Sequence, residues 1–182
     1  MLKLIHAFDM NTKNVYEYYK SFNNEKNDIN CYAITLINNP YEYYNYVKRY
    51  ENNLFYLVDS ENENYIIGFG TINEEIYNNN HVVIDTGNIG YGIRPSERNK
   101  GYCKELLKLL LRVCEELGMR KVYICCLKEN TASNKVILNN NGKLNKEYMD
   151  CFNKQIGLKY CIKVKPKIKN EIKRIKKKIS KF

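Results

Sequence analysis

Residues 88–117, with the sequence NIGYGIRPSERNKGYCKELLKLLLRVCEEL, place the strongest constraint on the fold. Ile89, Tyr91 and Ile93 alternate with smaller residues in the period-two pattern of a strand, and Pro95 ends that strand because proline donates no ladder hydrogen bond. Beyond a basic turn, apolar residues recur at helical spacing with lysines and glutamates between them. These positions are Leu106, Leu107, Leu110, Val113, Cys114 and Leu117. The sequence therefore predicts a strand that turns into a helix packed by one face.

The basic turn between the two elements has the features of an anion site. The first turn of a helix leaves about four backbone N–H groups without an intrahelical acceptor, and the helix dipole adds roughly half a positive charge there. Arg98 and Lys100 add whole charges, and Gly101 admits a bulky phosphate because it has no Cβ. We predict a pyrophosphate site with contacts from Arg98, Asn99, Lys100, Gly101, Tyr102 and Cys103. Composition alone equally fits a solvated basic turn, and the spacing of a P-loop is absent.

Two segments resemble the signatures of one family. Ile93, Pro95, Arg98, Gly101 and Cys103 resemble the acetyl-CoA signature of the GNAT superfamily of N-acetyltransferases, Val-x-Pro-x-x-Arg-x-x-Gly-x-Gly/Ala, with Cys103 in place of the last small residue. The second family signature is matched by Asn130, Ser133, Val136 and Gly142. The resemblance extends over residues 1 to 162. It implies an α/β fold (α+β by some schemes) with a mixed, splayed β-sheet flanked by helices, in the order β-α-α-β-β-β-α-β-α-β-β.

The resemblance also implies an activity and a set of site residues. Such a protein moves an acetyl group from acetyl-CoA to a primary amine, on a small molecule or a peptide, by direct attack in a ternary complex. The edges of the strands around Ile93 and Tyr123 would hold the pantetheine arm, and a backbone N–H near Ile93 would polarise the thioester carbonyl. Asn130 would reach the cofactor or an ordered water. Ser133 and Lys135 would lie near its phosphate end.

The residue that removes a proton from the amine is left open by the sequence. An ammonium of pKa about 10 needs a base at neutral pH. The acidic or titratable candidates are Glu74, Glu75, His81, Asp85 and Asp150, and spacing singles out none of them. GNAT enzymes often place a tyrosine acid seven residues after the signature asparagine, where this chain has Ile137, so that Tyr148, Tyr91 or solvent is left. Related enzymes often carry histidine where this chain has Asn88, and both departures favour the alternative of a catalytically weak acyl-CoA-binding regulatory module.

The net charge of +10 is concentrated at the C-terminus. Residues 163–182 hold ten Lys or Arg and only Glu171, whereas the first 162 residues carry 20 basic and 19 acidic side chains. We predict one acetyltransferase domain over residues 1–164 and a basic tail over residues 165–182. Isoleucines at helical spacing predict an amphipathic helix in the tail. The helix would dock on the domain, dock on a second copy in a homodimer, or make a weak polyanion contact with nucleic acid or anionic lipid.

Cysteine usage indicates the compartment. The seven cysteines lack Cys-x-x-Cys spacing and only two histidines accompany them, so we expect no metal site. An odd number of cysteines at apolar positions indicates reduced thiols. No apolar run approaches the ~20 residues that span a bilayer, and the first residues lack a secretory signal pattern. We therefore expect a cytoplasmic protein.

The remaining elements are predicted from periodicity and turn residues. The first expected strand is 2–8, and strands 54–59 and 65–72 are expected to form a hairpin around a polar turn at 60–64. A central strand is expected at 121–127, and strands 143–150 and 156–163 are expected to form a closing hairpin. The expected helices are 12–20, one that starts at Asn38-Asn39-Pro40, and a short one capped by Asn130. In the first helix, Val15, Tyr16 and Tyr19 are expected to lie on one face, and the tyrosines of this half of the chain would pack the helices onto a sheet or line a substrate cleft. Gly68 and Gly70 indicate a bulge or a close approach of another backbone within their strand.

Overall fold

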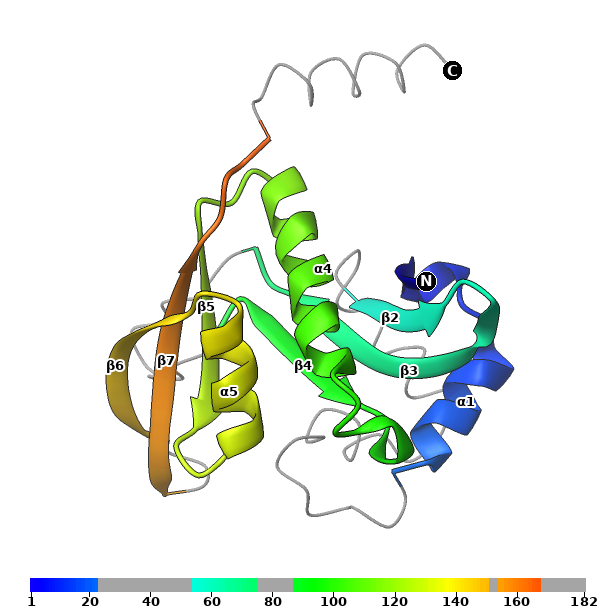
Figure 1. Ribbon diagram of the computed structural model, residues 1–182, viewed down its shortest axis with the longest axis horizontal. Coiled ribbons are helices and arrows are strands. Elements are labelled where there is room, and N and C mark those ends of the chain that lie inside the picture. Colours follow the sequence, from blue (N-terminus) through cyan, green and yellow to red (C-terminus); the bar gives the residue numbers. More distant parts are fainter. Residues whose placement is uncertain (23–53, 75–86, 151–153, 168–182) are drawn as a thin grey trace. The chain divides into compact units, whose positions relative to one another are not determined.

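The computed structural model describes residues 1–22, 54–74, 87–150 and 154–167 (Figure 1). The helix expected from Asn38 and the candidate residues Glu75, His81 and Asp85 lie outside these ranges. The chain divides into two compact units. One comprises Met1–Ile72 with Gly90–Leu109, and the other comprises Asn73–Ile89 with Leu110–Phe182. The predicted α/β class is confirmed, and the described elements form a mixed α/β fold with antiparallel sheets flanked by helices.

The first unit contains a four-stranded sheet in the order β1-β2-β3-β4. Its strands are β1 (Leu2–His6), β2 (Leu54–Asp59), β3 (Asn62–Ile72) and β4 (Ile89–Ile93), with antiparallel pairing from β1 to β2 and from β2 to β3. The predicted hairpin is confirmed, but β3 begins earlier than expected because Asp59 pairs with Asn62, which leaves a two-residue turn. The first strand ends at His6, and Ala7–Asp9 forms a 3₁₀ helix, η1.

Gly68 shows why the second strand of this hairpin carries glycines. A Cβ added to Gly68 would lie 2.8 Å from the carbonyl oxygen of Gly92 on β4, which is the expected close approach of another backbone. The register between β2 and β3 also shifts, because Leu57 pairs with Gly68 and Val58 pairs with Ile66. The extra residue between these pairs is a bulge. The bulge and the close approach of another backbone, which the sequence offered as alternatives for this strand, are therefore both present.

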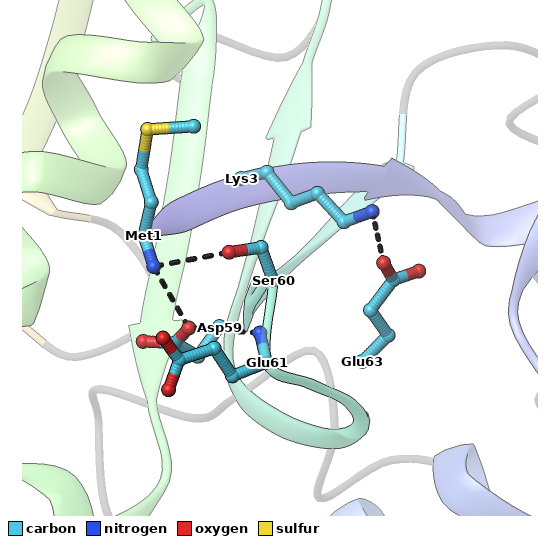
Figure 2. A network of polar contacts seen from close by, with 6 residues as sticks. All are labelled: Met1, Lys3, Asp59, Ser60, Glu61 and Glu63. Carbon is cyan, nitrogen blue, oxygen red and sulfur yellow. Dashed lines mark hydrogen bonds and ion pairs between the residues drawn. The ribbon is translucent and has the colours of Figure 1, made fainter.

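Polar contacts at the surface connect β1 to the β2–β3 turn (Figure 2). The Met1 ammonium donates to Asp59 Oδ1 at 2.9 Å and to Ser60 Oγ at 3.0 Å, and Lys3 forms an ion pair with Glu63. The hydrogen bond from the Met1 ammonium is the largest cause that lowers the pKa of Asp59. These groups are exposed, so the ion pairs add little stability and mainly fix the position of the first strand.

Helix α1 (Thr12–Lys20) begins after Asn11, whose side chain accepts a hydrogen bond from the Lys13 N–H at 2.8 Å. Asn11 is therefore the N-cap of α1. Of the predicted face, Val15 is buried and Tyr16 is not, while the side chain of Tyr19 lies outside what the structure describes. Val15, Tyr18 and Phe22 are buried, whereas Tyr16 is 40% exposed. Helical spacing allowed either face, and Phe22, which packs beyond the end of the helix, decides between them because it continues the row at i+7 from Val15.

Helix α4 (Tyr102–Glu116) confirms the amphipathic helix. Leu106, Leu107, Leu110 and Cys114 are fully buried. Leu117, the last predicted member of the apolar stripe, is 41% exposed because the helix has ended before it. Gly118 then adopts φ +82°, and the Met119 N–H donates to the Cys114 carbonyl at 3.0 Å. A glycine in the left-handed region after the last turn is the expected helix stop.

The second unit contains a three-stranded antiparallel sheet in the order β5-β7-β6. Its strands are β5 (Lys121–Leu127), β6 (Lys143–Asp150) and β7 (Gln155–Lys163), and α5 (Thr131–Asn139) follows β5. The closing hairpin is confirmed. The expected central position of β5 was wrong, because β5 lies at one end of this sheet. Its most buried residues, Val122, Ile124 and Leu127, have partly exposed residues between them, which fits a position at the end of the sheet.

The start of the predicted tail is tied to the end of α4. The Lys167 N–H donates to the Glu115 carbonyl at 3.1 Å, and the Lys167 ammonium pairs with Glu116 at 2.9 Å. Residues 168–182 lie outside the described ranges, so the tail helix, its partners and the domain boundary at residue 164 stay predictions. Within the described ranges, none of the helices has the length and apolar character needed to cross a bilayer. The described cysteines, Cys103, Cys114, Cys125, Cys126 and Cys161, are free thiols.

Candidate functional site

The turn between β4 and α4 has an unusual backbone. Asn99 and Gly101 both adopt the left-handed conformation, with φ +62° and φ +83°. A Cβ added to Gly101 would meet no atom within 4 Å, so the space above this residue is open. Left-handed residues beside right-handed ones turn successive amides toward one concave face, which is a common anion-binding arrangement. The geometry therefore fits the predicted approach of a phosphate to Gly101.

The first amides of α4 directly follow this turn. The Lys104 N–H donates to the Gly101 carbonyl at 3.1 Å. The N–H groups of Gly101, Tyr102 and Cys103 precede that bond, and in the part of the chain that the structure describes no group accepts from them. Amides at a helix start favour an anion, since they lack an internal acceptor and carry the positive end of the dipole.

Cys103 occupies the position where the family signature has glycine or alanine. Its side chain is half-buried, and burial raises the pKa of the thiol to about 12. The thiol is therefore protonated and uncharged at neutral pH. Because no charge is added beside the neighbouring amides, the departure from the signature is compatible with an anion at this turn.

The end of β4 presents a backbone donor on the side that faces away from β3. The Arg94 N–H donates to the Ile67 carbonyl of β3 at 2.8 Å. Since backbone N–H groups of a strand point alternately to either side, the Ile93 N–H points away from β3. β4 is the last strand in the order of its sheet. The Arg98 Nε donates to the Ile93 carbonyl at 3.3 Å, so this guanidinium is held against the strand end.

A polar chain that the sequence did not predict supports the same turn. Glu97 lies in the short 3₁₀ helix η3 (Pro95–Glu97), and it accepts a hydrogen bond from Tyr65 on β3 at 3.0 Å and one from Lys100 at 2.9 Å. The Arg94 guanidinium lies 4.3 Å from the centre of the Tyr65 ring. The only sequence signal was the i,i+3 spacing of Glu97 and Lys100, because Tyr65 is 32 residues away from Glu97.

The charge of Glu97 predicts a pH dependence of stability. The hydrogen bond from Lys100 is the largest cause that lowers the pKa of Glu97 below its usual 4.5. A lowered folded-state pKa contributes stability above the unfolded-state pKa, and this contribution is lost as pH falls through the folded-state pKa. In urea unfolding of wild type and Glu97→Gln between pH 7 and pH 3, the variant should be less stable at neutral pH and approach wild type at the acidic end. A constant difference across this range would contradict the assignment.

The second signature lies at the start of α5 in the other unit. Asn130 is the N-cap of this helix, and its Oδ1 accepts from the Ser133 N–H at 3.0 Å. Ser133 is half-buried and Lys135 is exposed. The side chain of Asn130 therefore shapes the turn that carries it. The contacts of Asn130, Ser133 and Lys135 with a cofactor stay predictions.

Asn134, which the sequence did not single out, connects α5 to two strands. Its Oδ1 accepts from the Tyr160 hydroxyl at 2.7 Å and from the Cys126 thiol at 3.2 Å. Its Nδ2 donates to the carbonyls of Leu127, Lys128 and Asn130. Burial raises the pKa of both the Tyr160 hydroxyl and the Cys126 thiol, the latter to about 11. Both groups are proton donors at neutral pH.

Asn88 is buried and bridges two backbone segments. Its Nδ2 donates to the Asn73 carbonyl at 2.8 Å, and its Oδ1 accepts from the Tyr123 N–H at 2.7 Å. The backbone of Asn88 contacts the same two residues, because its N–H donates to the Tyr123 carbonyl and its carbonyl accepts from the Asn73 N–H. The Asn88 side chain thus makes hydrogen bonds to Asn73 and to Tyr123 of β5 that resemble those of a neighbouring strand.

A family model described as an acetyltransferase (GNAT) domain matches residues 5–142. The chain belongs to the GNAT acetyltransferase family. As a GNAT protein it is an acetyl-CoA-dependent acyltransferase. A comparison of the sequence with curated proteins finds no match.

Solved structures of GNAT proteins share the fold at low identity. A GNAT-family acetyltransferase from Bacillus anthracis is 19% identical with a TM-score of 0.65, over 89% of this chain and 94% of that one. RimL, a ribosomal L7/L12 alpha-N-protein acetyltransferase in complex with coenzyme A, is 17% identical with a TM-score of 0.70, over 91% and 96%. The microcin C7 self-immunity acetyltransferase MccE, in complex with acetyl-CoA and AMP, is 18% identical with a TM-score of 0.66, over 90% and 92%.

The catalytic candidates are not brought together by the described contacts. Glu74 is exposed, and His81 and Asp85 lie outside the described residues. The Tyr148 ring on β6 packs against Gly157 of β7, where any Cβ would collide with it. Ile137, at the position of the common GNAT tyrosine, is fully buried, so this position belongs to the core. The roles of Glu74, His81, Asp85, Tyr148, Tyr91 and Asp150 stay predictions.

Proposed function

We propose that this GNAT protein transfers the acetyl group of acetyl-CoA to a primary amine, with the pyrophosphate held by the turn of residues 98–103. The observation that carries the proposal is the concave backbone at Asn99 and Gly101, which precedes helix amides that have no acceptor in the described ranges. This arrangement fits a diphosphate in charge, shape and hydrogen-bond donors. Arg98 and Lys100 add the cationic groups.

The remaining contacts follow from the side of β4 that faces away from β3. We assign the Ile93 N–H, which points away from β3, to the carbonyl of the thioester, where a fixed donor stabilises developing negative charge. Acetyl-CoA supplies an activated acyl group and a thiolate leaving group. The amine attacks in its neutral form, so the protein must accept one proton from it and return one to the thiolate. Asn130, Ser133 and Lys135 are assigned to the cofactor from the second signature.

The test is acetyl-CoA-dependent release of free thiol across a panel of amines. The panel contains polyamines, amino acids, aminoglycosides, and peptides that offer either a free N-terminus or a lysine. We expect thiol release that requires one class of amine and equals the amount of acetylated product measured by mass spectrometry. Reactions without amine give the background hydrolysis.

The panel also separates the proposal from the second candidate, a regulatory module that binds acyl-CoA without turnover. The core residue Ile137 in place of a tyrosine favours that candidate. Binding of coenzyme A without thiol release from any amine would support the module and overturn the transferase proposal.

A further inference from the structure

The side chain of Lys100 is held in place by the carboxylate of Glu97. Its ammonium donates to Glu97 Oε2 at 2.9 Å, while Glu97 Oε1 accepts from the Tyr65 hydroxyl at 3.0 Å. Each carboxylate oxygen therefore holds one donor, which fixes the plane of the carboxylate. The Glu97 side chain is only 14% exposed, whereas that of Lys100 is 52% exposed. The anchored end of the pair is the carboxylate, and the accessible end is the ammonium.

The residue that orients the Glu97 carboxylate, Tyr65, lies in the sheet and not in the turn. Tyr65 lies on β3, and the Arg94 guanidinium stacks 4.3 Å from its ring centre. Arg94 is itself fixed, because its Nε donates to the Ile66 carbonyl at 2.7 Å. A chain of contacts thus runs from β3 through Tyr65 and Glu97 to Lys100.

We propose that Tyr65 and Glu97 are positioning residues that hold the Lys100 ammonium for the pyrophosphate of coenzyme A. This inference rests on the proposed function. An ammonium has three donors, and one of them is used by Glu97. Lys100 lies between the two left-handed residues Asn99 and Gly101, so its amide belongs to the concave turn and its side chain is held beside that turn. Fixing a lysine in the free protein removes rotamer entropy that would otherwise be lost on binding.

The competing explanation is an ordinary surface ion pair, which would contribute little to binding. Replacing Glu97 does not separate the two explanations, because it also removes a negative charge that repels phosphate. Tyr65→Phe does separate them. It leaves every charge and the ring under Arg94 in place, and it removes only the hydroxyl that orients Glu97.

The experiment is isothermal titration of coenzyme A into wild type, Tyr65→Phe, Lys100→Met and the double variant. We expect Tyr65→Phe to weaken binding by about threefold to tenfold, and Lys100→Met by about tenfold or more. In the Lys100→Met background, Tyr65→Phe should have no further effect. Ser96→Ala is the matched control, since Ser96 Oγ lies 3.4 Å from the Tyr65 hydroxyl and carries no charge, and it should bind as wild type does.

A repeat with 3′-dephospho-coenzyme A assigns the phosphate. The factor for Tyr65→Phe should be the same for both ligands, because both carry the pyrophosphate. A factor that vanishes with the dephospho ligand, equal binding by Tyr65→Phe and wild type, or an effect that persists in the Lys100→Met background would each overturn the inference while the proposed function stands. A wild-type protein that binds neither ligand would overturn the proposed function and this inference with it.

Discussion

Gly101→Glu is expected to eliminate the thermal shift that acetyl-CoA gives to the wild-type protein. A ligand at 100 times its dissociation constant stabilises the folded state by ~2.7 kcal/mol, which is readily measured as a rise in Tm. The space above Gly101 is open, so a glutamate there would occupy the place assigned to the pyrophosphate and would add a like charge. The same titration with coenzyme A and NAD reports the specificity of the site.

The control for this variant lies after the last turn of the same helix. Gly118 has φ +82°, nearly the φ of Gly101, and a Cβ there also meets no atom within 4 Å. Gly118→Glu therefore shares the backbone strain of about 1–2 kcal/mol and the added charge. Both variants should lose stability without ligand, and only Gly101→Glu should lose the response to acetyl-CoA. An unchanged shift in Gly101→Glu would place the nucleotide elsewhere.

Asn88→Ala is expected to lower the free energy of unfolding by about 2–5 kcal/mol, because it leaves two backbone groups without their side-chain partner. Those groups are the Asn73 carbonyl and the Tyr123 N–H, and Asn88 itself is only 3% exposed. Urea unfolding followed by circular dichroism measures the change. The result decides whether the residue that replaces the histidine of related enzymes has a structural role.

Asn139→Ala is the matched control for that measurement. Asn139 is an exposed residue of α5, and its replacement should change stability by less than about 0.5 kcal/mol. If Asn88→Ala unfolds at the same urea concentration as wild type, the bridge to Asn73 and Tyr123 contributes nothing to stability. In that case the position would again be open to a role in the reaction.

The turn between β4 and α4 was predictable because its signals are local. Pro95, Gly101 and the apolar stripe that begins at Leu106 each constrain the backbone within a few residues. The same holds for the cap of α5 by Asn130, whose partner Ser133 is three residues away. Local signals of this kind also predicted the two hairpins, apart from the ends of the strands.

The supporting contacts could not be predicted, since their partners are far apart in the sequence. Tyr65 meets Glu97 across 32 residues, Asn88 meets Tyr123 across 35, and Asn134 meets Tyr160 across 26. No spacing rule connects such pairs, and only the packing of distant helices, strands and turns brings them together. Tyr16 was misplaced for a different reason, because Tyr18 and Phe22 also have helical spacing from Val15 and the sequence offered no means to choose between the two sets.

The ion pair between Glu97 and Lys100 has a consequence for ionic strength. One of the two cations assigned to the diphosphate already has its counter-ion within the fold, at 2.9 Å. Added salt screens net charge more than it weakens short hydrogen bonds with fixed geometry. Coenzyme A should therefore dissociate less readily in concentrated salt than the number of basic residues in the turn suggests.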